Sequence, residues 1–343
     1  MTVVITETNT NYVRFRIMRP AFDYIIIESF KAFLQINCAI IKGGNVVGCG
    51  NLLLDGILYD QIGKPLPIGG GILMDSLGFY ASNVGAFAIV PLFVQYTGPQ
   101  VRLLRYSDNQ KVDVWFDKAN NITKAVLASN PNTTVDIYTW LGQTDLKVID
   151  IWYNQSANGR HLTSNDNRDT EPIFIYDGVM QRYTAHFVSN RILSSTNLFI
   201  SNTITNMQML MRSREISRTG SFAVNFNGNN QASTGRFSMH IPWENGVWYW
   251  DPNDVGVNRV FSAITTSVGA VAEVSAYKSS RILRNGLEVN GAKYQSSGFS
   301  AGTVTNGLLL GTTTDTRIQY FIVFDSKTTD AETQNIFNMM KAV

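Results

Sequence analysis

The sequence has little charge and almost no cysteine. Only 16% of its 343 residues are charged, and 28 basic against 26 acidic residues leave a formal net charge of +2. A nearly neutral chain without a dense run of Lys or Arg has no field to hold a phosphate backbone, so nucleic-acid binding is not expected. Cys38 and Cys49 can form at most one bridge, so no disulfide framework supports the fold, and their redox state stays open.

Motifs of several enzyme classes are also missing. His161, His186 and His240 stand far apart and in no HxH or HExxH spacing, so no zinc site is expected. No phosphate-binding loop and no Ser or Cys nucleophile motif occurs, so no cofactor is expected. The N-terminus lacks a basic segment followed by an apolar stretch, which predicts that there is no signal peptide. Residues 76–95 are uncharged but contain Pro91, so we expect a buried helix or a subunit contact rather than a membrane span.

What the chain does have is a series of short segments rich in β-branched and aromatic residues. From about residue 100 onward they recur between turn signals and roughly alternate polar with apolar residues, as half-buried strands do. Such spacing predicts an all-β sandwich or barrel. The segments are 101–105, 112–116, 135–140, 148–153, 221–226, 247–250 and 318–324.

Only two segments are predicted to be helical, 82–93 and 329–340. In the second, Thr329 as N-cap and Glu332 three residues later form a capping box. The apolar residues of this helix share one face, which we expect to pack on the sandwich, and they are Ile336, Phe337 and Met340.

The first 70 residues are predicted to form a separate small β module. Residues 12–17 alternate apolar and basic side chains, residues 23–29 are β-branched and aromatic, and Gly43 and Gly44 indicate a tight turn. The Pro- and Gly-rich stretch 64–71 suits neither a helix nor a central strand. We therefore expect two domains, 1–70 and 71–343.

Four segments with distinctive motifs follow one another between residues 96 and 162. They are Tyr96-Thr-Gly-Pro99, Val101–Asp108, Val112–Asp117 and Ile151–Leu162. Their order and spacing resemble the YTGP, SD and WYDQSGNG motifs of the α-L-arabinofuranosidase B catalytic-domain family. The resemblance covers residues 75–343 and implies a concanavalin A-like jelly-roll β-sandwich with a C-terminal helix. Related domains occur in phage and large-virus structural proteins.

Two later segments support the same fold. Met239–Trp250 resembles the sandwich signature in which a strand enters through an HxPW segment and turns at Asn245-Gly246. Tyr277–Val289 is similar to a strand pair of laminin G-like domains, with Arg284-Asn285-Gly286 as the expected hairpin turn. Both signatures specify turns, so they bear on fold more than on activity.

The resemblance also implies two catalytic carboxylates. Glu244 stands where the family has its nucleophile, and Asp315 stands where it has its acid/base. A retaining glycosidase holds such a pair about 5–5.5 Å apart. The family's vicinal cysteine pair has no counterpart in residues 206–230, and residues 153–159 lose an acid and a glycine of the pattern. These departures favour a protein that is not an enzyme, and turn chemistry alone also explains both carboxylates.

A second set of expected site residues is aromatic. The densest aromatic cluster comprises Trp243, Trp248, Tyr249 and Trp250. Aromatic faces stack on sugar rings, so the cluster is a candidate glycan platform. Strand alternation places Trp248 and Trp250 on one face and Tyr249 on the other, so part of the cluster can equally be core. Asp251 and Asp254 offer oxygen ligands for calcium, with a solvated turn as the alternative.

Three functions remain open. The low charge, the missing signal peptide and the incomplete active-site pattern favour a virion structural protein, a capsid or tail component assembled in the host cytoplasm. Such a protein would form homo-oligomers or bind other virion proteins through the apolar region 43–95, without a membrane partner. The alternatives are a carbohydrate-binding adhesin, whose partner is a glycan, and an active retaining arabinofuranosidase-like glycosidase.

Overall fold

The computed structural model divides the chain into two compact units, Met1–Gly69 and Gly70–Val343. In the first unit it describes residues 2–9, 12–18, 41–42, 45–46, 52–54 and 57–59. In the second unit it describes residues 84–342 except 94, 143–144, 165–167, 189, 197, 199–202, 205, 219–221, 227–233, 244, 255–257, 297, 300–303, 306 and 313–314. The predictions for residues 23–29, for the stretch 64–71 and for the two cysteines lie outside the described residues.

The described part of the first unit consists of antiparallel strand pairs. β1 (Thr2–Asn9) pairs with β2 (Tyr12–Met18), and β2 contains the strand expected at 12–17. The short strands β3 (Ile41–Lys42) and β4 (Asn45–Val46) pair on either side of the expected turn at Gly43 and Gly44. A third pair joins β5 (Leu52–Leu54) to β6 (Ile57–Tyr59).

The second unit contains a long antiparallel sheet, here called the first sheet. Its neighbouring strands run in the order β11, β10, β9, β8, β12, β13, β16, β27, β19, β20, β21, β22. The strands that open this order are β11 (Asn130–Thr134), β10 (Ile122–Leu127), β9 (Lys111–Phe116), β8 (Val101–Arg105), β12 (Lys147–Trp152) and β13 (Leu162–Thr163). The others are β16 (Arg191–Ser195), β27 (Leu308–Thr312), β19 (Phe222–Phe226), β20 (Thr234–His240), β21 (Tyr249–Asp254) and β22 (Val260–Phe261).

The second sheet is built around β28 (Asp315–Phe324) and β18 (Met207–Ser217), which pair along nearly their full length. On one side, β18 pairs with β23 (Val271–Ser279). The next strands in the sheet on that side are β24 (Arg284–Val289) and β25 (Ala292–Gln295). On its other side, the two halves of β28 pair with β7 (Val84–Ala88) and with β15 (Arg182–Val188), which leads to β14 (Ile173–Asp177). A single bridge between Val148 and Ile173 joins the two sheets, and β17 (Thr203–Ile204) pairs separately with β26 (Val304–Thr305).

One hydrophobic core lies between the two sheets. It takes Val101, Trp152 and Trp250 from the first sheet and Met209 and Phe321 from the second, all fully buried. The described residues therefore form an all-β sandwich with a C-terminal helix, which confirms the predicted fold class. The expected strands 101–105, 112–116, 148–153, 221–226 and 318–324 fall in β8, β9, β12, β19 and β28, whereas only the last two residues of 247–250 belong to a strand, β21.

The helix predicted over 82–93 is wrong, because this segment contains strand β7. Its side chains alternate between two apolar layers: Phe87 joins the core between the sheets, and Ala86 and Ala88 face a second cluster under the C-terminal helix. A strand buried on both faces shows an uninterrupted apolar run, which periodicity cannot distinguish from a buried helix. No described helix is long and apolar enough to cross a membrane.

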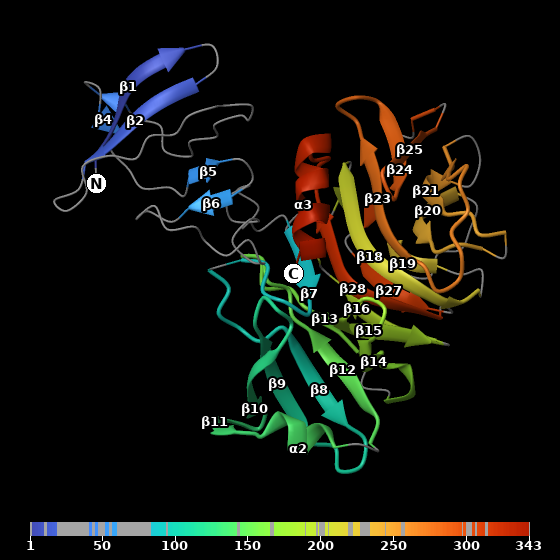
Figure 1. Cartoon of the computed structure of the whole chain (residues 1–343). Helices are drawn as coiled ribbons and strands as arrows, with labels where there is room; N and C mark the ends of the chain where they lie inside the picture. The colour runs from blue at the N-terminus through green and yellow to red at the C-terminus, as the bar shows by residue number, and fades with distance from the viewer. Residues whose placement is uncertain are drawn as a thin grey trace. The chain divides into compact units, whose positions relative to one another are not determined.

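The C-terminal helix was predicted correctly. α3 (Asp330–Ala342) begins at the expected capping box, in which Thr329 N–H donates to Glu332 Oε2 at 2.7 Å and Glu332 N–H donates to Thr329 Oγ1 at 3.2 Å. Ile336, Phe337 and Met340 are buried in the second cluster, on the outer face of the second sheet. Figure 1 shows α3 (red) alongside the strands of that sheet.

Two other local predictions are corrected by the structure. Residues 135–140 are not a strand, because Asp136 caps the short helix α2 (Ile137–Leu141) and turns Ile137 and Trp140 inward. The expected hairpin turn Arg284-Asn285-Gly286 is wrong, because these three residues begin strand β24. A Cβ at Gly286 would meet the Tyr277 ring at 2.2 Å, so the glycine is there to admit that ring.

The polar residues of the motif at 151–162 have a structural task. Asn154 Oδ1 accepts a hydrogen bond from Ala86 N–H at 2.9 Å. Gln155, fully buried, donates to the carbonyls of Ala88 and Val90 and accepts from Leu92 N–H at 2.8 Å. These side chains satisfy backbone groups in and after β7 that would otherwise lack partners.

Candidate functional site

Asp315, the expected acid/base, begins β28 and is tied into the second sheet. Its Oδ1 lies 2.8 Å from His186 Nε2 on β15, and its Oδ2 accepts from Ser217 Oγ on β18 at 2.5 Å. The side chain is only 18% exposed. Both carboxyl oxygens are therefore engaged by the chain.

Glu244, the expected nucleophile, lies outside the described residues, but its neighbours in the chain are described. They form a turn in which Gly246 N–H donates to the Trp243 carbonyl at 2.6 Å and Gly246 has φ +77°. A Cβ at Gly246 would meet the Arg218 guanidinium at 3.0 Å. Since Ser217, which donates to Asp315, directly precedes Arg218, Asp315 and the described turn residue Gly246 lie at the same edge of the sandwich.

Glu215 is a further carboxyl near Asp315 that the sequence did not single out. It lies near the C-terminal end of β18, is 4% exposed and forms an ion pair with Arg218 at 3.5 Å. Burial, helped by the nearby charge of Asp315 and opposed by Arg218, raises the pKa of Glu215. A carboxyl with a raised pKa beside another acid is a feature of glycosidase sites, but Glu215 is too deeply buried to touch a sugar.

The structure divides the predicted aromatic cluster as strand alternation suggests. Trp248 and Trp250 are 2% and 0% exposed and belong to the core. Their indole N–H groups donate to Thr266 Oγ1 and to the Tyr277 carbonyl, at 3.1 and 3.0 Å. These two tryptophans are therefore not available to a ligand, whereas Trp243 is 38% exposed and Tyr249 is partly exposed.

Phe261 on β22 extends the exposed part of the cluster and was missed by sequence reasoning. It pairs with Tyr249 in the sheet, is 58% exposed, and its ring centroid lies 6.3 Å from that of Tyr249. The Trp243 and Tyr249 rings lie 5.5 Å apart, edge to face. We call Trp243, Tyr249 and Phe261 the aromatic patch. Only the strand register reveals Phe261, because no local pattern marks an isolated exposed phenylalanine.

A buried polar network fixes Trp243 in place. Its indole N–H donates to His240 Nδ1 at 3.1 Å, and His240 Nε2 lies 3.0 Å from Asp251 Oδ2. An indole N–H can only donate, so the His240 proton is on Nε2, which donates to Asp251. Arg259 binds both Asp251 oxygens at 2.6 and 2.9 Å. Burial alone would raise the pKa of Asp251, but the hydrogen bonds from His240 and Arg259 outweigh it and lower that pKa.

The same network involves Asp251, which the sequence offered as a calcium ligand. The side chain is fully buried and its oxygens are held by His240 and Arg259, so it does not present ligands to a solvent cation. The side chain of Asp254 lies outside the described residues. Within the part of the chain that the structure describes, no group of three or more His, Cys, Asp or Glu side chains is arranged to hold a metal ion.

Polar groups border the aromatic patch. The Arg259 guanidinium carbon lies 5.0 Å from the centre of the Tyr249 ring. Asn245 Nδ2 donates to the Tyr249 hydroxyl at 3.0 Å, and its side chain is exposed. The aromatic rings of the patch are thus bordered, at the same edge, by the guanidinium group of Arg259 and the side-chain amide of Asn245.

Comparison with solved structures supports the fold. The chain is similar to a GH54 α-L-arabinofuranosidase variant soaked with 4-nitrophenyl α-L-arabinofuranoside, with a TM-score of 0.55 and 10% identity. It is equally similar to an arabinofuranosidase complexed with arabinofuranosyl-α-1,2-xylobiose, with a TM-score of 0.55 and 11% identity. In both cases the match covers 75% of this chain and 62% of the other, so it spans less than two thirds of those enzymes. No protein-family model and no curated protein sequence matches the chain.

Proposed function

We propose that the sandwich binds a carbohydrate through the aromatic patch. The observation that carries this proposal is an exposed tryptophan, tyrosine and phenylalanine held in contact at one edge, with Trp243 fixed by a buried His–Asp–Arg network. Rings that are already held in place lose little conformational entropy when a ligand binds. Fixed exposed rings without a structural task are a feature of binding surfaces.

The chemistry of the patch suits a sugar. The apolar C–H faces of a sugar ring can lie on aromatic rings, while the hydroxyls bond to planar polar groups at the border. Arg259 and Asn245 provide such groups beside Tyr249. The two arabinofuranosidases that share the fold were solved with an arabinofuranoside and with an arabinofuranosyl xylobiose, which makes an arabinose-bearing glycan the first ligand to test.

A glycan array with the purified full chain tests this function. We expect binding that Trp243→Ala weakens by about tenfold or more, because burying a large apolar side chain contributes roughly 1.5–3 kcal/mol. The matched control is Tyr138→Ala, which removes a 63% exposed ring from α2, away from the patch. Absence of any glycan ligand, or equal binding by the Trp243 variant, contradicts the proposal.

Hydrolysis is the second candidate, because Asp315 and the residues flanking Glu244 lie at one edge. Against it, a general acid must present a proton to the leaving oxygen, whereas both Asp315 oxygens contact His186 and Ser217. We therefore expect no release of nitrophenol from 4-nitrophenyl α-L-arabinofuranoside. Release that is lost in Glu244→Gln would instead establish a glycosidase.

The virion structural role and the assembly through residues 43–95 stay predictions. The apolar character of β7 now has a second explanation, because Phe87 is buried between the sheets and Ala86 and Ala88 are buried under α3. Light scattering on the purified chain measures the assembly: a stable ring or trimer is the outcome that the prediction requires, and a monomer at all concentrations contradicts it.

A further inference from the structure

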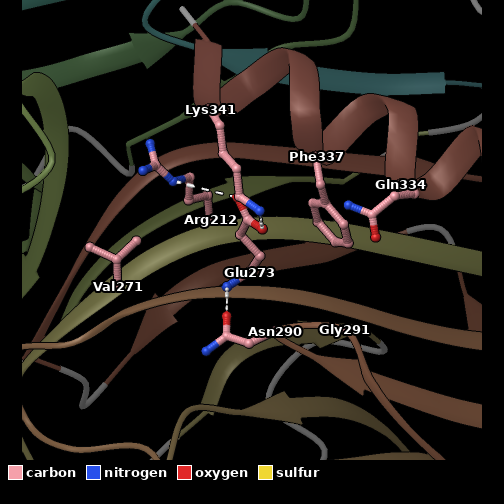
Figure 2. Close-up of a pocket in the computed structure, with 8 residues that line it drawn as sticks. All are labelled: Arg212, Val271, Glu273, Asn290, Gly291, Gln334, Phe337 and Lys341. Carbon is pink, nitrogen blue, oxygen red and sulfur yellow. Dashed lines mark hydrogen bonds and ion pairs between the residues drawn. The ribbon is translucent and has the colours of Figure 1, made fainter.

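A cavity of about 330 Å³ lies on the outer face of the second sheet, beneath the C-terminal helix. Figure 2 shows Gln334, Phe337 and Lys341 descending from α3 toward the strands that carry Arg212 and Glu273, with Asn290 at the adjoining turn. Ligand pockets span roughly 300–1,000 Å³, so this cavity suits a ligand of one small ring. It contains none of the residues of the aromatic patch.

The cavity carries one net positive charge. Lys341 Nζ lies 2.6 Å from Glu273 Oε2, and Arg212 Nε lies 3.8 Å from Glu273 Oε1. Two cationic side chains thus share a single carboxylate. Lys341 is 51% exposed at the mouth, whereas Glu273 is 7% exposed. An anionic group entering the cavity would meet the uncompensated charge.

Buried polar atoms in and under the cavity lack partners. Among the described residues, Arg212 Nε and Glu273 Oε1 have no hydrogen-bond partner, because 3.8 Å between them is too long for a bond. Gln319 and Tyr320 on β28, which neighbour Arg212, also have unpartnered polar atoms, Nε2 and the hydroxyl, in side chains that are 1% and 0% exposed. Buried polar groups without partners are rare, and each calls for a ligand or a water.

Further hydrogen-bonding groups remain at the mouth. Asn290 Oδ1 accepts from Glu273 N–H at 2.8 Å, which leaves the Asn290 amide N–H₂ as a donor. Gln334 Nε2 donates to Asn338 at 3.1 Å, which leaves its carbonyl oxygen as an acceptor. Asn290 and Gly291 form the two-residue turn between β24 and β25, with φ of 49° and 85°, so the amide is rigidly placed. Phe337 and Val271 give the cavity its apolar surface.

We propose that this cavity binds a hexuronic acid, a six-carbon sugar that carries one carboxylate. The carboxylate would lie between Lys341 and Arg212. Ring hydroxyls would donate to Glu273 Oε1 and accept from the Asn290 amide, and an apolar ring face would lie toward Phe337. The proposal concerns a second site and does not depend on ligand binding at the aromatic patch.

Other ligand classes fit less well. A bare anion such as acetate offers no donor to Glu273 Oε1 and no ring for the apolar surface. A neutral hexose leaves the positive charge uncompensated. An amino acid would bring an ammonium group to Glu273, whose charge is already shared by Lys341 and Arg212. Only a hydroxylated acid satisfies the donors, the acceptor and the charge together.

Calorimetric titration of the full chain with sodium D-glucuronate, supported by saturation-transfer NMR, tests the proposal. We expect saturable binding that is at least about tenfold tighter than binding of D-glucose, sodium acetate or L-serine, since a hydrogen bond to a charged group is worth a factor of this size. No signal in either method, or a control ligand that binds as tightly as glucuronate, overturns the proposal.

Matched variants locate the site. Lys341→Gln is expected to weaken glucuronate binding by about tenfold or more. Lys293→Gln is the control, because Lys293 is also 51% exposed and forms a 2.6 Å ion pair, with Asp330 outside the cavity. Equal losses in the two variants, or no loss in either, contradict the assignment. Loss of binding in Trp243→Ala would show that glucuronate occupies the aromatic patch instead, which also contradicts it.

Discussion

Gly311 shows how strictly single positions are set in this sandwich. It lies in β27 with φ +100°, and a Cβ there would stand 2.3 Å from the Arg191 carbonyl oxygen of the neighbouring strand. We expect Gly311→Ala to lower the free energy of unfolding by about 3 kcal/mol or more, because backbone strain and a backbone clash act together. Chemical denaturation measures this. Gly178→Ala, where nothing lies within 4 Å, should change little, and similar losses in the two variants would refute the argument.

Lys278 gives the molecule a testable pH dependence. It is 1% exposed, its ammonium lies 5.0 Å from the centre of the Phe237 ring, and burial lowers its pKa to about 8. The folded pKa is below the unfolded value of 10.5, so between these pH values the unfolded chain binds more protons and stability rises with pH. The slope is at most about 1.4 kcal/mol per pH unit.

The Lys278→Met variant should lack this rise. Denaturation of both proteins between about pH 8 and 10.5 is the measurement, and Lys124→Met, at an exposed lysine, is the control that should keep the rise. Parallel stability curves for wild type and Lys278→Met would contradict the assignment of the low pKa to Lys278.

At the residue scale, the sequence predicted the site only in part. Trp243 and Tyr249 could be selected because aromatic residues crowd one segment. Alternation could divide the cluster, but only the structure showed that the face with Trp248 and Trp250 is the buried one. Phe261 could not be selected, because its place beside Tyr249 follows from a strand pairing rather than from a local pattern.

At the scale of elements, α3 was predictable because its signals are local. The capping box and the apolar face both lie within one helix, and the structure confirms them. β7 was not predictable as a strand from local signals. Its outer face is apolar because α3, a helix more than two hundred residues later in the chain, covers that face. The prediction of a strand at 135–140 is wrong, because Asp136 caps a helix there although polar and apolar residues alternate as in a strand.

The capping box of α3 leads to a prediction of its own. Thr329→Ala removes an acceptor for Glu332 N–H and should destabilise the protein by about 1 kcal/mol. Asn335→Ala, at an exposed position inside the same helix, should be neutral or slightly stabilising, since alanine has the higher helix propensity. Thermal or chemical denaturation distinguishes the two, and equal effects would show that the cap contributes nothing.

At the scale of the whole molecule, the described part of the second unit has three layers, the first sheet, the second sheet and α3, with an apolar cluster between each neighbouring pair. One core lies between the sheets, and a second lies between the outer sheet and α3. The likeness to arabinofuranosidases covers 75% of the chain and concerns the fold. Two surfaces of the sandwich carry the functional proposals: the aromatic patch at the edge of the first sheet and the charged cavity under α3.

The most direct test of the account is the affinity of the best array glycan for the full chain, measured by calorimetry with Phe261→Ala beside the wild type. Phe261 is 58% exposed, so its removal should leave the fold intact. If the patch binds the sugar, the affinity falls by about tenfold, since loss of a stacked ring removes roughly 1.5 kcal/mol. An unchanged affinity in a folded variant would show that the glycan binds elsewhere and that the patch is not its site.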